Sequence, residues 1–105
     1  MAAVTPVDIG TLIETRPGFR GGRPVITGTG THVHALAALY RDRMSADEIA
    51  DEYEHLPRSH VFAAIAYYLA NSEEIAGYLA EEARAYEQGR AEMGPSPLVR
   101  KYLGR

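Results

Sequence analysis

Residues 45–70 read SADEIADEYEHLPRSHVFAAIAYYLA, and this stretch decides the fold. It opens on a capping box, because the Ser45 hydroxyl can accept from the Glu48 N–H while the Glu48 carboxylate reaches back to the Ser45 N–H. A helix is predicted over 46–54. The single proline of the stretch disfavours helical backbone at the residue before it and opens a second helix over 58–70. Two helices joined by a turn of about three residues indicate a helix-turn-helix.

Helical periodicity continues on both sides of this motif. Upstream, a helix is predicted from Val33 to Arg43, with cations in its last turn. Downstream, Asn71 and Glu74 are predicted to form a second cap, followed by a helix that runs to about Gly89. The apolar residues expected to face inward recur at helical spacing: Val33, Leu36, Ala37, Tyr40, Ala46, Ile49, Ala50, Tyr53, Val61, Ala64, Ile65, Tyr68, Ile75, Leu79, Ala83 and Tyr86.

The N-terminal third is predicted to hold turns and short strands. Its segments are a β-prone run at 11–15, a Gly- and Pro-rich loop at 16–24, and two short strands at 25–27 and 31–33 around a tight turn. A lone two-stranded ribbon is marginal in water. We therefore expect this ribbon to pack on the helices or to pair with a second chain. Val25, Ile26 and Thr27 are the candidate dimerisation residues of a homodimer.

Composition restricts the class of protein. The chain has 105 residues and no cysteine, which suits one domain without disulfides or thiolate metal sites. It shows no membrane-length apolar run and no signal peptide, so the expected location is the cytoplasm. Residues 46–92 carry three arginines and eleven acidic residues, whereas residues 1–45 carry five arginines and three acidic residues. An acidic helical body between two basic ends suits two kinds of partner.

The second helix of the motif is the one that enters the DNA major groove in DNA-binding versions. The candidate DNA-binding residues are Arg58, Ser59 and His60 at its start, with Arg41 and Arg43 nearby for phosphates. Two observations favour a purely structural role instead. The preceding helix carries five acidic residues and no base, which would repel phosphates. The helix over 58–70 is apolar almost all round, which is typical of a buried helix.

Three segments carry a family resemblance. Residues 22–29 (GRPVITGT) resemble the "GKPVIRGTRI" signature of the bacterial family called domain of unknown function 433, residues 44–49 (MSADEI) its "G-x-S-x-E-E-I" segment, and Tyr53 to Tyr68 its "(D/E)-Y-P-x-L … V-x-A-A-L-x-Y" stretch. Gly30 and Thr31 depart from the Arg and Ile of the signature. The resemblance implies a mainly α fold: a homeodomain-like helix-turn-helix core with a short N-terminal β-ribbon, a long C-terminal helix and a tail. It also implies a VapB-like antitoxin, encoded beside a PIN-like ribonuclease toxin.

The sequence divides into a domain over 1–92 and an interaction tail over 93–105, where Ser96-Pro97 is predicted to start a short helix. The tail is basic and apolar, and an inserted cation could displace metal from the carboxylate cluster of a PIN-like active site. The candidate toxin-binding residues are Tyr86, Met93, Leu98, Val99, Arg100, Lys101, Tyr102, Leu103 and Arg105. The alternative is that the tail packs on its own domain or is disordered.

We expect no enzyme, cofactor or metal site. His32 and His34 lack an evident third ligand and are interpreted as solvated or capping residues. The glycines at 28–30 lack the spacing and lysine of a phosphate-binding P-loop. Adjacent acids such as Glu81 and Glu82 suggest a solvated helix face. Two functions remain: a toxin-neutralising antitoxin that also binds operator DNA, or a protein-interaction and dimerisation module without DNA binding.

Overall fold

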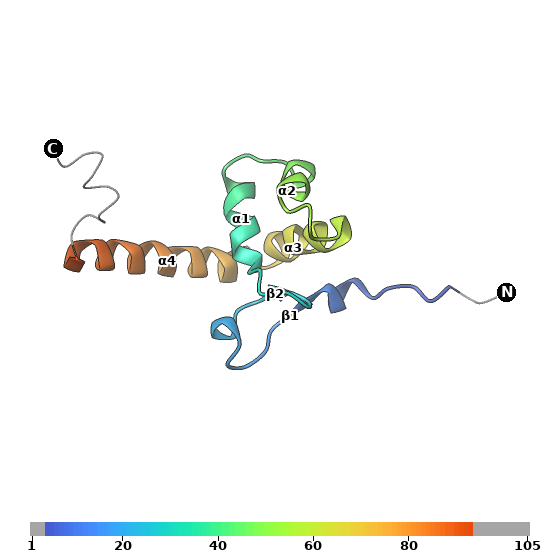
Figure 1. Ribbon diagram of the computed structural model, residues 1–105, viewed down its shortest axis with the longest axis horizontal. Helices are drawn as coiled ribbons and strands as arrows, with labels where there is room; N and C mark the ends of the chain where they lie inside the picture. The colour runs from blue at the N-terminus through green and yellow to red at the C-terminus, as the bar shows by residue number, and fades with distance from the viewer. Residues whose placement is uncertain (1–3, 94–105) are drawn as a thin grey trace.

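The computed structural model describes the backbone of residues 4–93 and the side chains through Ala91. The elements of this part of the chain are two short 3-10 helices (Ile9–Leu12 and Arg20–Gly22), the strands β1 (Ile13–Glu14) and β2 (Val25–Ile26), and the helices α1 (Val33–Arg41), α2 (Ala46–Glu52), α3 (Arg58–Ala70) and α4 (Ser72–Met93). The mainly helical class, the N-terminal ribbon and the long C-terminal helix agree with the sequence-based expectation. Figure 1 shows α1, α2 and α3 gathered above the ribbon, with α4 leaving the body to one side.

Helices α1, α2 and α3 pack around one apolar core. The predicted capping box is present, since the Glu48 N–H donates to Ser45 Oγ at 3.1 Å and the Ser45 N–H donates to Glu48 Oε1 at 2.8 Å. α3 has its predicted bounds, whereas α2 ends two residues early because Tyr53 leaves helical geometry at φ −104° and ψ 54°. The buried core consists of Ile26, Val33, Leu36, Ala37, Ile49, Ala50, Leu56, Val61, Ala64, Ile65 and Ile75.

The ribbon is held within the protomer. Its antiparallel register pairs Ile13 with Ile26 and Glu14 with Val25. On its other side β2 is joined to the segment predicted as a strand over 31–33 by an isolated bridge between Val25 and His32 and by the Ile26 N–H, which donates to the Thr31 carbonyl at 2.9 Å. This segment is not a strand, because α1 begins at Val33. Both strands also contact α3. Packing on the helices therefore stabilises the ribbon, which is the first of the two predicted alternatives.

This arrangement bears on the expected dimer contact through β2. Val25 and Ile26 are 0% exposed and lie between two neighbouring segments. The Thr27 N–H donates to the Leu12 carbonyl at 2.9 Å, and its hydroxyl donates to the Thr11 carbonyl at 2.6 Å. A strand of a second chain would find no free edge at Val25 and Ile26. The expectation that Val25 and Ile26 pair edge to edge with a second chain is therefore corrected, because the protomer itself supplies the neighbouring segments on both sides of β2.

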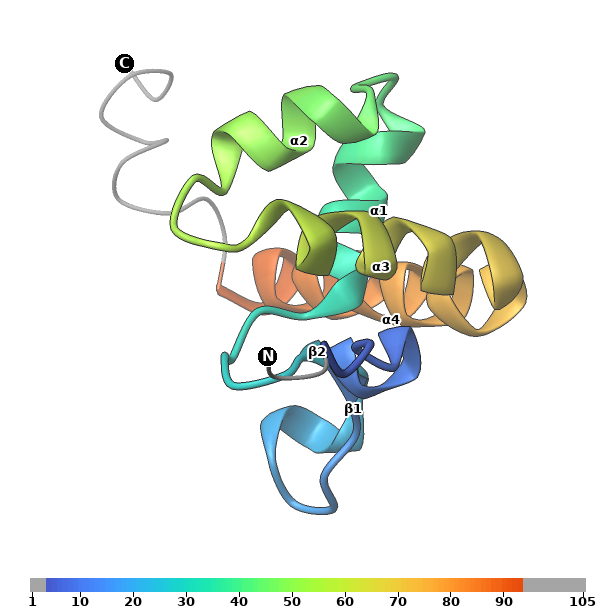
Figure 2. The ribbon, with the colours of Figure 1, turned by 90° about the vertical axis from the view of Figure 1, so that its right-hand side faces the viewer.

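α3 is only partly covered, although its apolar sequence predicts burial all round. Val61, Ala63, Ala64 and Ile65 are buried against the rest of the body. Phe62 and Leu69 are 42% and 57% exposed, on the side that faces away from the core. α4 does not cover this side, because it leaves the body in another direction (Figure 1) and lies behind α3 in Figure 2.

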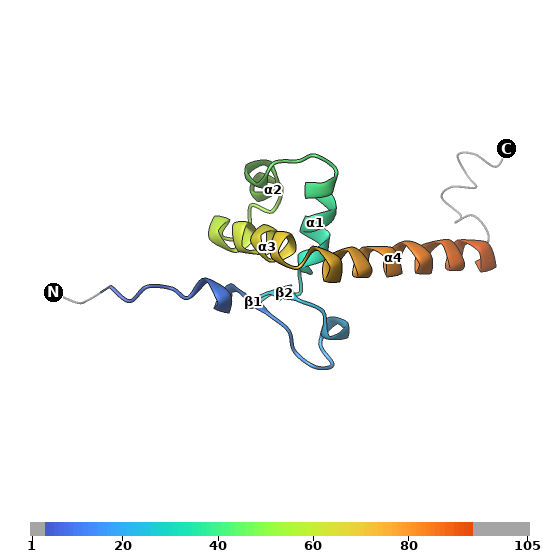
Figure 3. The same cartoon turned by 180° about the vertical axis from the view of Figure 1, so that it is seen from behind.

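α4 divides into two halves, which we call the root (residues 72–82) and the arm (residues 83–93). In the root, Ile75 is fully buried and Leu79 is partly buried against α1 and α3. The predicted inward positions of the arm, Ala83 and Tyr86, are wrong, because both side chains are exposed. Viewed from behind, the N-terminal segment and α4 leave the body in opposite directions (Figure 3). No helix of the described residues has the length and apolarity to cross a membrane.

The predicted cap at the start of α4 is replaced by a different contact. Asn71 is the C-cap of α3 at φ −130° and ψ 46°, so its side chain turns back and donates to the Tyr67 carbonyl at 3.1 Å. The Glu74 carboxylate accepts from the Tyr67 hydroxyl at 2.8 Å and from the Tyr78 hydroxyl at 2.7 Å. Burial and the hydrogen bond to Glu74 raise the pKa of Tyr67 to about 12. Tyr67 thus ties the end of α3 to the root of α4, whereas the Tyr78 hydrogen bond lies within α4.

Candidate partner-binding surfaces

The start of α3 presents a neutralised arginine. The Arg58 guanidinium donates to Asp47 Oδ1 at 2.9 Å and lies 3.6 Å from Asp51 Oδ1, and both carboxylates come from α2. The hydrogen bond to Asp47 is the main cause that raises the pKa of Arg58. Ser59 Oγ lies 3.3 Å from Nδ1 of its neighbour His60, so these two candidate base-reading groups contact each other. The geometry of a helix-turn-helix is present, but the charge of Arg58 at the start of α3 is neutralised by the two carboxylates of α2.

Arg41 and Arg43 lie where α1 ends and the chain turns toward α2. Both side chains are exposed, and neither has a carboxylate within ion-pair distance among the described residues. Arg43 adopts a left-handed φ of 76°, a conformation that non-glycine residues rarely adopt. These two arginines are therefore the cations of the predicted DNA-binding set that stay available in the protomer.

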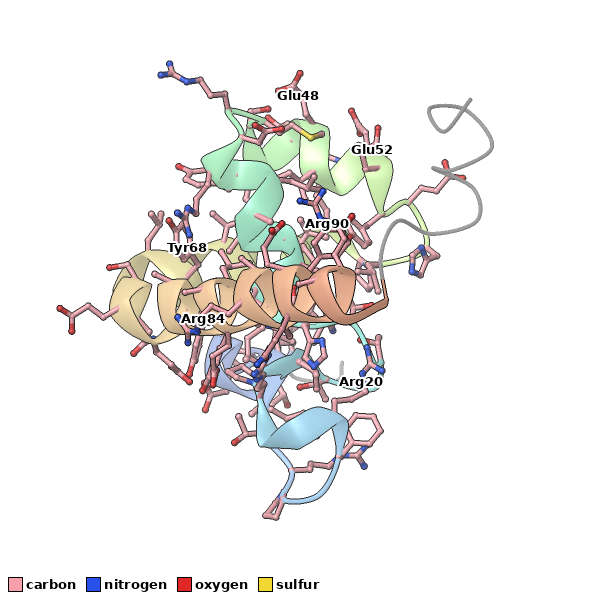
Figure 4. The ribbon with its side chains drawn as sticks, turned by 90° about the vertical axis from the view of Figure 1, so that its left-hand side faces the viewer. Arg20, Glu48, Glu52, Tyr68, Arg84 and Arg90 are labelled. Carbon is pink, nitrogen blue, oxygen red and sulfur yellow. The ribbon has the colours of Figure 1, made fainter. Side chains whose placement is uncertain are left out.

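α2 presents a strongly acidic outer face. Its exposed carboxylates and the one that follows the helix are Asp47, Glu48, Asp51, Glu52 and Glu54. Figure 4 shows Glu48 and Glu52 at the top of the view and Arg20 in its lower half. A nucleic acid that approached along α2 would meet this negative charge first.

The root of α4 contacts a buried histidine of α1, which sequence reasoning missed. His34 is 2% exposed, and its Nε2 donates to Glu82 Oε2 at 2.7 Å. Nδ1 of the same ring is buried without a hydrogen-bond partner among the described residues. Burial lowers the pKa of His34, and the hydrogen bond to Glu82 opposes this effect in part. The interpretation of this histidine as solvated or capping is wrong. The missed signal is that His34 lies one turn before Ala37 on a buried side of α1.

A second contact beside this histidine ties the ribbon to α4. The Arg23 guanidinium donates to Glu81 Oε1 at 3.0 Å and lies 4.8 Å from the centre of the Tyr78 ring. Glu81 and Glu82 therefore hold two different elements, the ribbon and α1, although they were expected to form a solvated face. Because the side chains of Glu81 and Glu82 are each about half-exposed, we expect each contact to add only modestly to the free energy of unfolding.

The two histidines do not form a metal centre in the described part of the chain. The His32 and His34 rings stack with their centres 4.4 Å apart, and His32 Nε2 lies 3.1 Å from the Arg20 carbonyl oxygen. Within residues 4–91, the structure brings together no group of three or more His, Cys, Asp or Glu side chains that could hold a metal.

The arm of α4 is exposed on all sides of the helix, apart from the partly buried Gly89. It is 11 residues long by its bounds, which corresponds to about 16 Å of helix. Tyr86, a predicted toxin-binding residue, is 67% exposed on this arm. Met93 is the last residue of α4. The other predicted toxin-binding residues, Leu98, Val99, Arg100, Lys101, Tyr102, Leu103 and Arg105, lie outside the described residues.

The fold and these surfaces define a class of small protein: a helix-turn-helix body with an N-terminal ribbon and a projecting helical arm. The family profile described as "Protein of unknown function (DUF433)" matches residues 13–68. The chain belongs to this family. A crystal structure of a DUF433 member from Anabaena variabilis is similar, with 30% sequence identity and a TM-score of 0.59. The similarity covers 67% of this chain and 69% of that one. None of the curated proteins matches.

Proposed function

We propose that this protein is the antitoxin of a type II toxin–antitoxin pair and that it neutralises a PIN-like ribonuclease by binding it with the arm of α4 and the tail. The observation that carries the proposal is the arm itself. Its described residues are exposed, apart from Gly89, which is partly buried. A helix of this length without tertiary packing is marginal in water. A partner that packs on the arm supplies the stabilisation that the body does not.

The apolar face of the arm continues the face that packs in the root. Ile75 and Leu79 contact the core, and Ala83 and Tyr86 follow them at helical spacing beyond the edge of the body. A partner seated beside the body would extend the same packed face. The tail begins at the end of this helix and carries Arg100, Lys101 and Arg105. Cations that follow an anchored helix suit the metal-binding carboxylates of a PIN-like active site.

Two matched variants test the arm. Ala83→Arg places a charge on the proposed binding face, and Ala85→Arg places the same charge on the opposite face. Both substitutions cost little helix propensity. With the PIN-like ribonuclease encoded beside this chain, Ala83→Arg is expected to weaken binding by about tenfold or more, and Ala85→Arg to leave it unchanged. Equal binding by both variants contradicts the proposal, as does the lack of such a ribonuclease.

The contribution of the tail is tested separately. Truncation after Gly94 removes the three tail cations and keeps the whole of α4. We expect the truncated chain to bind the ribonuclease but to inhibit it poorly in an RNA-cleavage assay. Full inhibition without residues 95–105 would assign the whole function to the arm.

Operator-DNA binding by a homodimer is the second proposed activity. Exposure of Arg41 and Arg43 supports it, whereas the acidic face of α2 and the ion pairs of Arg58 support a protein-interaction module without DNA binding. We propose no catalytic activity for the chain. A salt-dependent mobility shift on the upstream DNA separates the alternatives: a sequence-specific shift that Arg41→Gln and Arg43→Gln abolish supports the operator. Sedimentation as a monomer at micromolar concentration would count against the dimer.

A further inference from the structure

The longest stretch of the described chain without an acidic residue lies before the helix-turn-helix. Residues 15–41 contain four arginines and two histidines and no acidic residue. The loop between β1 and β2 holds three of these arginines. It lies below α3 in Figure 2, whereas α2 lies above α3. The acidic α2 and this basic loop therefore lie on different sides of α3, and Figure 4 shows Arg20 in the lower half of the view, away from Glu48 and Glu52.

Two arginines of this loop have no carboxylate partner. Among the described residues Arg23, Arg58 and Arg90 each have a carboxylate within 4.0 Å, but Arg16 and Arg20 have none. Both side chains belong to exposed residues. An arginine that has no internal partner keeps its capacity for an external anion. We propose that Arg16 and Arg20 form a binding site for the phosphodiester backbone of a nucleic acid.

Contacts within the ribbon hold both guanidinium groups in place. The Arg16 guanidinium lies 3.9 Å from the centre of the Phe19 ring. Arg20 Nε donates to the Gly30 carbonyl at 3.1 Å, and the Arg20 carbonyl lies 3.1 Å from His32 Nε2. Arg20 also adopts a left-handed φ of 52°. Prior ordering lowers the entropy lost when such groups bind a phosphate. Arginine also suits phosphate because its planar fork can donate two parallel hydrogen bonds.

The surroundings of these arginines leave room for a large polyanion. Gly18, Gly21 and Gly22 occupy the turns of the loop at positive φ, with no atom within 4 Å of the position that a Cβ would take. The face is thus open backbone with cationic side chains. A nucleic acid suits it better than an isolated anion, because its regularly spaced phosphates can meet Arg16 and Arg20 separately. Such binding is independent of nucleotide sequence and needs neither the toxin nor the operator contact.

An NMR titration of the full chain locates the contact. The probe is a 20-base-pair DNA duplex of arbitrary sequence at about 50 mM salt. We expect the amide shift changes to cluster at residues 16–23 and 30–32. Changes centred on residues 41–60 would assign the binding to the helix-turn-helix and overturn the loop site. No change at millimolar duplex would overturn phosphodiester binding altogether.

Charge-matched variants then test the two arginines. Arg16→Gln with Arg20→Gln removes two charges from the loop, and Arg84→Gln with Arg90→Gln removes two from α4. For two lost phosphate contacts, the slope of log K against log salt should fall by about 1.8. We expect the loop pair to show this fall and the α4 pair to keep the wild-type slope. Equal falls in both pairs would mean that only net charge matters and would overturn the site.

Two further measurements keep the test decisive. Arg16→Gln alone removes a side chain whose described contact is the Phe19 ring, so it leaves the Arg20 hydrogen bond intact. It should lower the slope by about 0.9.

A single-stranded RNA of the same length is expected to bind through the same residues, since it shares the phosphodiester chemistry. A polyglutamate of equal charge that binds as tightly as the duplex would overturn the nucleic-acid assignment.

Discussion

The root and the arm of α4 belong to one continuous helix but have different surroundings. Both carry apolar residues at the same helical spacing, Ile75 and Leu79 in the root and Ala83 and Tyr86 in the arm. The root is covered by α1 and α3, whereas the arm projects beyond them (Figure 1). Their difference shows that apolar spacing predicts which side of a helix packs against other residues. It does not show whether those residues belong to the same chain or to a partner. The root serves the fold, and the arm is available to a partner.

The largest expected effect is on core packing in the root. Ile75→Ala leaves a cavity at a fully buried position and should lower the free energy of unfolding by about 2–5 kcal/mol. Tyr86→Ala in the arm should change it by less than about 0.5 kcal/mol. Urea unfolding of the two variants measures both values. A cost above about 1 kcal/mol for Tyr86→Ala would mean that the arm packs on the body in solution, which would contradict the distinction between root and arm.

A smaller effect is expected where the root meets α1. Glu82→Ala leaves the buried His34 Nε2 without its acceptor and should cost about 1 kcal/mol. Glu81→Ala removes a half-exposed ion pair with Arg23 and should cost less than about 0.5 kcal/mol. The two variants lose the same group at adjacent positions, so urea unfolding isolates the burial of the partner. Equal costs would show that the histidine contact adds nothing special to the root.

The root should also respond to pH through His34. Burial lowers the pKa of this histidine below its usual 6.5 in the folded chain. Between the two pKa values the unfolded chain binds more protons, so the free energy of unfolding falls as the pH drops through about 6.5 and levels off below the folded pKa. Urea unfolding at pH 7.5 and pH 5.0 should show less of this fall in His34→Gln than in the wild type. An unchanged pH dependence in that variant would contradict the assignment.

Sequence reasoning succeeded where the signals are local. The Ser45–Glu48 capping box, the proline before α3 and the helical spacing within 58–70 each depend on neighbouring residues, and the structure confirms them. The resemblance carried by residues 22–29 likewise indicated the family that the comparisons show. These features need no knowledge of which segments meet in space.

The errors concern contacts between distant segments. Ala83 shares the apolar spacing of Ile75, but periodicity cannot show that the body ends before it. His34 looked like a surface residue because its acceptor, Glu82, lies 48 positions away. The second edge of β2 is occupied by β1, which pairs across the whole 16–24 loop. The basic loop was interpreted only as a turn, because the ion pairs that distinguish Arg58 from Arg20 appear only in three dimensions.

The last expected effect is a small stabilisation, and it comes from a matched pair of glycines in α4. Gly77 in the root and Gly89 in the arm both leave open space where a Cβ would stand. Replacing a helical glycine by alanine stabilises the helix by about 0.5–1 kcal/mol. Gly77→Ala should therefore raise the free energy of unfolding of the whole domain, because the root unfolds with the core. Gly89→Ala should leave that value unchanged and slow amide hydrogen exchange only in the arm, because a helix without tertiary contacts opens locally. If Gly89→Ala instead stabilised the whole domain as much as Gly77→Ala, the arm would be part of the cooperative fold and less free to serve a partner.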